Sequence, residues 1–298
     1  MVAACGGKDS NSGKDSNGSA TTAVTTTTLG AGNGTFTKRT ETFVDASRNT
    51  GTTPGRTLPT DIYVPGGTGP FPLIVHNHGL DGSSAKFSEL LGAWATAGYI
   101  VVAPNFPLTN AATPKGQTSI GDFVNQPADV RFVLDKVLAE NERGGALDRK
   151  IATDHMGVSG LSLGGGSTYP LIFHPCCRDE RFRSAILMSA MELPFAGGDY
   201  DWTRRFPILV FSGTADAAVN YAQQQAIVAK LPGPTWAVTL DGGLHAPPFE
   251  NAPSPHDAVV TSTSTDFWAA TLRDDAAAAS RIATDATVPG LSSVVVTP

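Results

Sequence analysis

Residues 155–166 read HMGVSGLSLGGG, an apolar run that passes through Gly160–Gly164 (GLSLG) into a series of small residues. A Gly-x-Ser-x-Gly pentapeptide between a strand and a helix is typical of a nucleophile elbow, in which the serine sits on a sharp turn. Glycine at the two flanking positions lets the strand and the helix approach closely, where a side chain would clash. The motif therefore predicts a strand, a turn and a helix, with Ser162 as an activated nucleophile.

Two further residues follow in the chain order that such a nucleophile needs. Asp216 comes after the apolar, strand-like run Phe206–Phe211, and His245 follows a second strand-like run and a glycine pair. A serine hydroxyl needs a base to accept its proton, and the imidazole needs an acid that fixes its tautomer. Serine, acid, histidine is a known order of this triad. We therefore expect Ser162 as nucleophile, His245 as base and Asp216 as its orienting acid.

Other histidines and acids leave alternatives for the partners of the serine. Asp241 lies four residues before His245 and would have to fold back from the same loop. His256 lies in a proline-rich segment that we expect to begin the last helix. Both remain alternatives at this stage, whereas His155 and His174 are expected to be structural.

A separate apolar strand, Phe71–Asn77, ends in His-Gly-Leu. A tetrahedral intermediate carries negative charge on its oxygen, and two backbone N–H groups commonly stabilise that charge. We expect these donors to be the amides of Leu80 and Leu163. His76 and His78 invite a metal interpretation, but the chain continues HNHGLD and lacks the second half of the dinuclear zinc pattern. We expect no metal and no cofactor, and hydrogen bonds from both histidines under this loop.

The chain resembles α/β hydrolases of the dienelactone hydrolase and platelet-activating-factor acetylhydrolase-like group, which lie near bacterial cutinases and polyester hydrolases. The resemblance runs from about Phe36 to the C-terminus and rests on the motifs around Leu80, Ser162, Asp216 and His245. It implies an α/β-hydrolase fold and a serine carboxylic ester hydrolase that acts through an acyl-enzyme. The nucleophile departs from the pattern, because dienelactone hydrolases proper carry a cysteine there.

The substrate groove is expected to be open. Residues 191–205, after the sixth strand, form a loop with a proline and two glycines that is too short for a cap domain. We expect Leu80, Leu163, Met191 and Phe249 to wall the groove. Polyester hydrolases of the cutinase type usually have an aromatic residue at the first of these positions and a tryptophan near the third. The alternative is a small pocket roofed by the loop 106–121.

The expected substrates are small-molecule esters, extending to bulky or polymeric ones. Alternative functions are a lipid-type esterase of the acetylhydrolase or phospholipase kind, a lactonase, and an inactive surface-binding lipoprotein. A net charge of −6 without a basic run disfavours nucleic acid as a partner. We expect a monomer that meets a membrane only through an N-terminal lipid anchor.

The N-terminal segment predicts export. Val2–Cys5 reads VAAC, which fits the end of a truncated bacterial lipoprotein signal with Cys5 as the lipidated residue. Residues 6–35 are almost wholly small and polar, so residues 1–35 are expected to be the truncated signal end followed by a flexible tether. The expected location is extracytoplasmic, either lipid-anchored to the bacterial cell membrane or secreted. The remaining cysteines, Cys176 and Cys177, are expected to be buried free thiols, because neighbouring residues close only a strained ring.

The rest of the chain, residues 36–298, predicts one catalytic domain of the α/β class. The composition is 41% hydrophobic and 16% charged, enough for a large core. Eight strands alternate with helices, and several strands are apolar without alternation, as in parallel sheets covered on both faces. We therefore expect a mostly parallel eight-stranded sheet flanked by helices, with antiparallel strands first and no cap domain. Residues 274–298 could be a strand or a loose tail.

Overall fold

A computed structural model of the chain describes residues 28–298. Cys5 and most of the predicted tether lie outside the described residues. The lipid anchor and the boundary between tether and domain therefore stay predictions.

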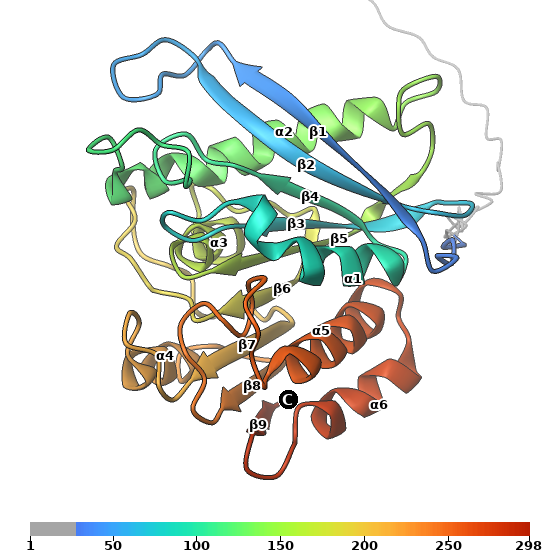
Figure 1. Cartoon of the computed structure of the whole chain (residues 1–298), viewed down its shortest axis with the longest axis vertical. Helices are drawn as coiled ribbons and strands as arrows, with labels where there is room; N and C mark the ends of the chain where they lie inside the picture. The colour runs from blue at the N-terminus through green and yellow to red at the C-terminus, as the bar shows by residue number, and fades with distance from the viewer. Residues whose placement is uncertain (1–27) are drawn as a thin grey trace, which may run out of the picture.

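A single sheet forms the centre of the molecule (Figure 1). Its nine strands have the order β1-β2-β4-β3-β5-β6-β7-β8-β9. The inner strands from β4 to β8 run parallel, whereas β1, β2 and β9 pair antiparallel. The strands are β1 (Phe36–Asp45), β2 (Arg56–Pro65), β3 (Phe71–Asn77), β4 (Ile100–Pro104), β5 (Ile151–Leu161), β6 (Phe182–Met188), β7 (Ile208–Gly213), β8 (Thr235–Leu240) and β9 (Ser292–Thr297). This confirms the expected fold class, and the strand beyond the expected eight is β9.

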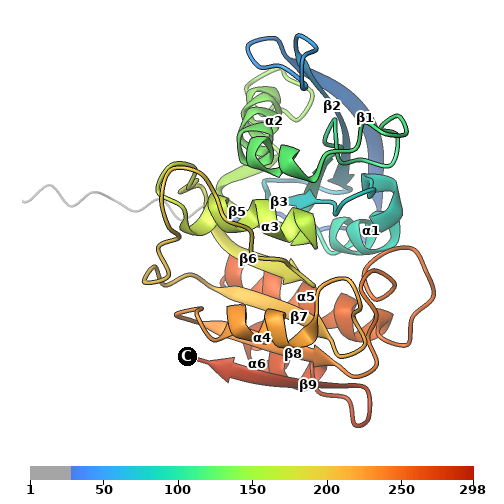
Figure 2. The same ribbon diagram turned by 90° about the vertical axis from the view of Figure 1, so that its left-hand side faces the viewer.

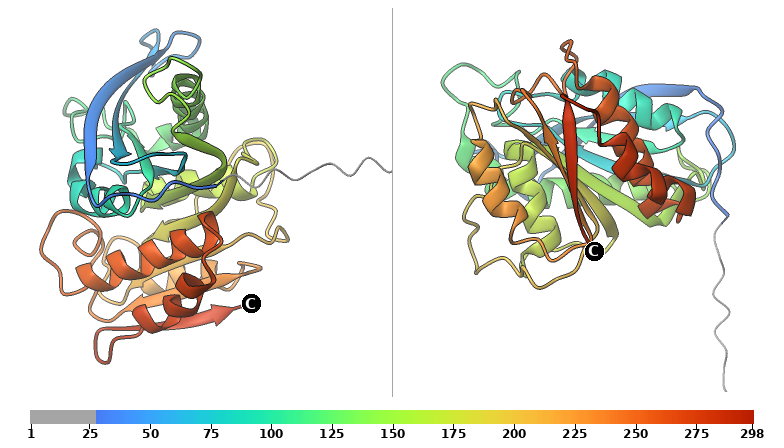
Figure 3. Two further views of the ribbon diagram at one scale, coloured as in Figure 1. Left: turned by 90° about the vertical axis from the view of Figure 1, so that its right-hand side faces the viewer. Right: turned by 90° about the horizontal axis from the view of Figure 1, so that it is seen from below.

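Helices cover both faces of the sheet. Figure 2 shows α2, α3 and α4 on one face, and Figure 3 shows α1, α5 and α6 on the other. The helices are η1 (Ser84–Phe87), α1 (Ser88–Thr96), η2 (Ile120–Asn125), α2 (Gln126–Glu140), α3 (Leu163–Phe173), α4 (Tyr221–Val228), α5 (Asp257–Leu272) and α6 (Ala276–Asp285). Within residues 28–298, no helix has both the length and the apolar character needed to cross a bilayer.

Two apolar clusters fill the space between the helices and the sheet, one on each face. The first contains α2 residues such as Val130 and Leu134, and the second contains Trp94 of α1 and Trp268 of α5. The rings of these two tryptophans meet edge to face with centroids 5.7 Å apart. Burial on both faces explains why the central strands are continuously apolar. The sheet is therefore a rigid platform whose strand ends carry the loops described below.

The two neighbouring cysteines differ from the expectation. Cys176 and Cys177 are joined by a disulfide in the turn after α3, so the prediction of free thiols is wrong. The prediction of burial is wrong as well, because Cys176 is exposed and Cys177 is half-buried. The turn after α3 places both side chains at the surface, where the two sulfurs can meet without displacing core residues.

Candidate active site

The turn between β5 and α3 holds Ser162 in an unusual backbone conformation, with φ 56° and ψ −117°. Residues other than glycine rarely adopt such backbone angles, and the angles persist only where the surrounding structure enforces them. The flanking glycines show this enforcement. A Cβ atom on Gly160 would lie 2.3 Å from the carbonyl oxygen of Gly164, and one on Gly164 would lie 2.1 Å from the oxygen of Asn77. The elbow predicted from the sequence is present, with Ser162 at its apex.

The structure brings Asp216 and His245 together at the carboxyl ends of β7 and β8. His245 Nδ1 lies 2.8 Å from Asp216 Oδ2. The N–H groups of Ala218 and Val219 donate to Asp216 Oδ1 at 2.9 and 2.8 Å. The Asp216 side chain is fully buried, whereas that of His245 is 24% exposed. The carboxylate is thus fixed, while the imidazole can reach the open face of the site.

The surroundings of Asp216 favour its ionised form. Burial alone would raise the pKa of this carboxyl, but the hydrogen bonds from His245 and from the Val219 amide lower it below its usual value. An ionised acceptor beside Nδ1 keeps the proton of the neutral imidazole on that nitrogen. His245 Nε2 then carries a free lone pair, which is what a general base needs.

Gln224 is a residue that the sequence analysis missed. Its buried side chain on α4 donates from Nε2 to Asp216 Oδ2 at 3.1 Å and to the carbonyl of Val219 at 2.6 Å. It therefore holds the carboxylate oxygen that also contacts His245. A glutamine eight residues after the acid has no recognisable motif, and only the placement of α4 reveals the contact.

The backbone amides of Leu80 and Leu163, near Ser162, donate to no group within residues 28–298. Leu163 is the first residue of α3, and the first N–H groups of a helix have no intrahelical acceptor. The loop before Leu80 borders the serine, because a Cβ atom on Gly79 would lie 3.8 Å from Ser162 Oγ. Both amides are therefore available to an oxygen atom bound beside Ser162.

His78 fixes the orientation of the loop that carries Leu80. Its Nδ1–H donates to the carbonyl of Gly79 at 2.7 Å, and its Nε2 accepts from the N–H of Phe106 at 3.0 Å. Burial lowers the pKa of His78 to about 4, so the ring is neutral and can play both roles. Because a peptide unit is planar, holding the Gly79 carbonyl also sets the direction of the Leu80 N–H. His78 is thus a positioning residue for this amide.

His76 lies deeper, beneath the same loop. Its Nδ1 lies 2.9 Å from the hydroxyl of Ser159, and its ring packs on Phe87 with centroids 4.3 Å apart. Burial, together with the neighbouring His78, lowers the pKa of His76 to about 3. Both histidines of the HNH segment therefore make the hydrogen bonds expected from the sequence.

Acidification should destabilise the fold through these two histidines. Both have folded pKa values, about 3 and about 4, well below the 6.5 of an unperturbed imidazole. As the pH falls from 6.5 towards 4, the unfolded chain binds protons that the folded protein excludes. The free energy of unfolding then decreases by up to about 1.4 kcal/mol per pH unit for each histidine. Above that window neither histidine contributes.

Urea denaturation at successive pH values between neutrality and pH 4 measures this slope. In His76→Asn, we expect the free energy of unfolding to fall less steeply with pH, by up to about 1.4 kcal/mol per pH unit, because one of the two histidines is absent. An unchanged slope in that variant would show that His76 does not titrate as its burial requires.

The loop 106–121 borders the Leu80 side of the site. The N–H of Asp81 donates to the carbonyl of Thr109 at 2.8 Å, which joins this loop to the one after β3. Just beyond the loop, Asp122 accepts two hydrogen bonds from the buried guanidinium of Arg56, at 3.0 and 2.8 Å. The loop is therefore fastened at both ends.

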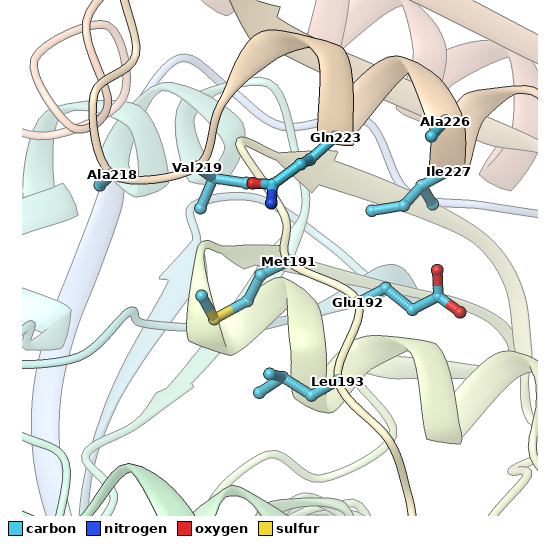
Figure 4. A pocket seen from close by; sticks show the side chains of 8 residues that line it. All are labelled: Met191, Glu192, Leu193, Ala218, Val219, Gln223, Ala226 and Ile227. Carbon is cyan, nitrogen blue, oxygen red and sulfur yellow. The ribbon is translucent and has the colours of Figure 1, made fainter.

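A cavity of about 390 Å³ lies on the opposite side, between the segment after β6 and helix α4 (Figure 4). Met191 lines it, as the sequence analysis predicts for the groove. Phe249 does not lie there. It is 3% exposed, packs against Phe211, and borders a separate hollow near Leu90 of α1. The side chain of Leu163 is also fully buried and cannot wall the groove. Leu163 can therefore meet a ligand only through its backbone amide.

The alternative base His256 and the two histidines expected to be structural, His155 and His174, all make structural contacts. His256 Nε2 lies 2.9 Å from the carbonyl oxygen of Asp241, and His155 Nδ1 lies 2.8 Å from that of Leu272. His174 is near the two cysteines, but its Nε2 contacts the Gly198 carbonyl and its Nδ1 accepts from a backbone N–H. With its nitrogens engaged and the two sulfurs bonded to each other, this group has no free ligand atoms for a metal.

The family model described as Chlorophyllase matches residues 25–191, which is more than half of the chain. No curated protein matches the chain. The matched region contains Leu80, Ser162 and Met191 but ends before Asp216 and His245. The assignment of the acid and the base therefore depends on the geometry described above.

Proposed function

The chain belongs to the chlorophyllase family of α/β hydrolases, and from this we infer that it hydrolyses carboxylic esters through an acyl-enzyme. The family indicates an ester hydrolase at the level of its class. The residue roles and the substrates are proposed. The closer grouping with dienelactone hydrolases, acetylhydrolases and cutinases has no support from the comparison and stays a resemblance.

The proposed reaction starts with attack of Ser162 Oγ on the ester carbonyl carbon, while His245 Nε2 takes the hydroxyl proton. Asp216 stabilises the imidazolium, and the amides of Leu80 and Leu163 donate to the oxyanion. His245 then gives its proton to the departing alcohol oxygen, leaving an acyl group on Ser162. A water molecule attacks this acyl-enzyme, its proton passes through His245 to Ser162 Oγ, and the carboxylic acid leaves.

One observation carries the proposal: the 2.8 Å contact between His245 Nδ1 and a buried, four-times hydrogen-bonded Asp216 carboxylate. A surface histidine beside a carboxylate would not need this support. The arrangement fixes one imidazole nitrogen and leaves the other free at the carboxyl ends of the strands, where Ser162 also lies. An inactive surface-binding lipoprotein would not require it.

The proposed substrates are small esters and, beyond them, bulky or polymeric esters, because the segment after β6 carries no cap domain. Lipid-type esters and lactones would use the same triad. The family name refers to chlorophyll, so chlorophyll is one further ester to test. We also propose an exported protein, lipid-anchored through Cys5 or secreted. The Cys176–Cys177 disulfide supports export, since disulfides persist mainly in oxidising compartments.

A panel of esters tests the proposed function. The purified protein should hydrolyse p-nitrophenyl acetate and p-nitrophenyl octanoate, and its rate should show no jump where the substrate exceeds its solubility limit. A butyrolactone, a phospholipid, an aliphatic polyester film and chlorophyll complete the panel and separate the alternatives. Turnover of none of these compounds would contradict an ester hydrolase, whereas turnover of the lactone alone would favour a lactonase.

A further inference from the structure

The cavity beside α4 has a predominantly apolar wall. It lies between the segment that follows β6 and the loop and helix that follow Asp216, and it measures about 390 Å³. Figure 4 shows side chains from both segments facing one another across it. Its apolar lining consists of Met191, Leu193, Ala218, Val219, Ala226 and Ile227.

The wall of this cavity is continuous with the catalytic residues. The N–H of Met191 donates to the carbonyl of Ser162 at 3.3 Å. On the other side, Ala218 and Val219 donate their N–H groups to the carboxylate of Asp216. A group held at the carbonyl-attack position of Ser162 would therefore have this cavity within reach.

The first turn of α3 packs against two of the residues that line the cavity. A Cβ atom on Gly166 would lie 3.6 Å from both Met191 Cγ and Leu193 Cδ1. The carbonyl oxygen of Met191 lies closer, at 3.0 Å from that position, so the two apolar side chains pack beside one backbone polar group at the first turn of α3. A chain leaving the reacting carbonyl would meet the apolar side chains of Met191 and Leu193.

The charged residue at the edge of the cavity is already neutralised. Glu192 Oε2 lies 2.5 Å from the ammonium of Lys230. Gln223 is exposed and adds only an uncharged amide to the lining. The cavity therefore offers no unpaired charge to a ligand, which favours a hydrocarbon over a polar or ionic group.

We propose that this cavity binds the hydrocarbon chain of the ester substrate, and so sets a preference for medium-length over acetyl-sized or methyl-sized groups. The inference rests on the proposed function for its kinetic part. Burial of apolar groups strengthens binding by up to about fourfold per methylene. The value of kcat/KM should therefore rise with chain length until the cavity is full. The chain belongs either to the acyl part or to the alcohol part of the ester.

A substitution that fills the cavity tests the proposal, with a matched substitution on the same helix. Ala226→Phe places a ring in the cavity, whereas Ala222 is exposed on α4 and does not line it. In Ala226→Phe, we expect kcat/KM for p-nitrophenyl octanoate relative to the acetate to fall at least tenfold. Ala222→Phe should keep the wild-type ratio. A second pair, octyl acetate and ethyl acetate, tests the alcohol part in the same way.

A binding measurement separates this proposal from the proposed function. Octan-1-ol is titrated by calorimetry into Ser162→Ala, alone and combined with each phenylalanine substitution. We expect Ala226→Phe to raise the Kd at least tenfold and Ala222→Phe to leave it within about twofold. Thermal melting checks that each protein is folded.

The outcomes are distinct. If Ala226→Phe lowers kcat/KM for p-nitrophenyl octanoate relative to the acetate, the cavity binds the acyl chain. If it lowers kcat/KM for octyl acetate relative to ethyl acetate, the cavity binds the alcohol chain. If no ester is hydrolysed but octanol binds with the expected pattern, the proposed function fails and the cavity assignment stands. Unchanged ratios in both series, or an unchanged Kd in Ala226→Phe, overturn the cavity assignment, while ester turnover would still support the proposed function.

Discussion

Ser162→Ala should lose about a million-fold in kcat on every ester that the wild-type protein hydrolyses, because no other group can form the acyl-enzyme. Losses of this order follow removal of a triad serine. The fold should persist, since alanine needs no more space than serine at the elbow. The measurement is initial-rate kinetics on the best ester of the panel, with thermal melting of the same preparation.

Ser280→Ala is the matched control, because Ser280 is exposed on α6, far along the chain from the elbow. It should keep wild-type kinetics. Activity of Ser162→Ala within tenfold of wild type would disprove the assignment of the nucleophile.

His245→Ala should be about as damaging as loss of the serine. Without the imidazole, nothing takes the hydroxyl proton of Ser162, and the buried carboxylate of Asp216 loses the hydrogen bond to the ring. In a related triad, removing the histidine alone costs about as much as removing all three residues. Initial rates and substrate-saturation curves measured side by side with Ser162→Ala test this expectation.

His256→Gln distinguishes the base from the alternative histidine. His256 contacts the carbonyl of Asp241 and the hydroxyl of Ser254 rather than the triad. We expect its substitution to lower the melting temperature by a few degrees, about the cost of one buried hydrogen bond, and to change kcat little. The reverse pattern, with His256→Gln inactive and His245→Ala active, would mean that the base has been assigned to the wrong residue.

Much of the sheet could be predicted because its strands are buried on both faces. The expected strand over residues 71–77 coincides with β3, and the helix expected directly after the Ser162 turn is α3. The pairing of Asp216 with His245 followed from chain order, since both come after strands whose carboxyl ends meet at one edge of the sheet. The sequence of residues 274–298 does not distinguish a strand from a loose tail, because the valines of the short β9 stay largely exposed and follow no alternation of buried and exposed positions.

Other features depend on contacts between segments that are distant in the sequence. The cavity joins residues after β6 to α4, and neither segment alone has a binding motif. Phe249 is expected to wall the groove, yet the turn after His245 directs its ring into the core against Phe211. The disulfide is not predictable from the sequence, because only the fold shows that the turn after α3 lies at the surface.

The elbow and the cavity differ in how much sequence change each can accept. At Gly160 and Gly164 any side chain would meet a carbonyl oxygen, so chemistry and folding share the same few atoms. The cavity wall is different, because Gln223 and Ala226 on α4 are exposed and make no contact with the triad. For protein engineering, selectivity can therefore be redesigned from α4 while the reaction machinery is left as it is.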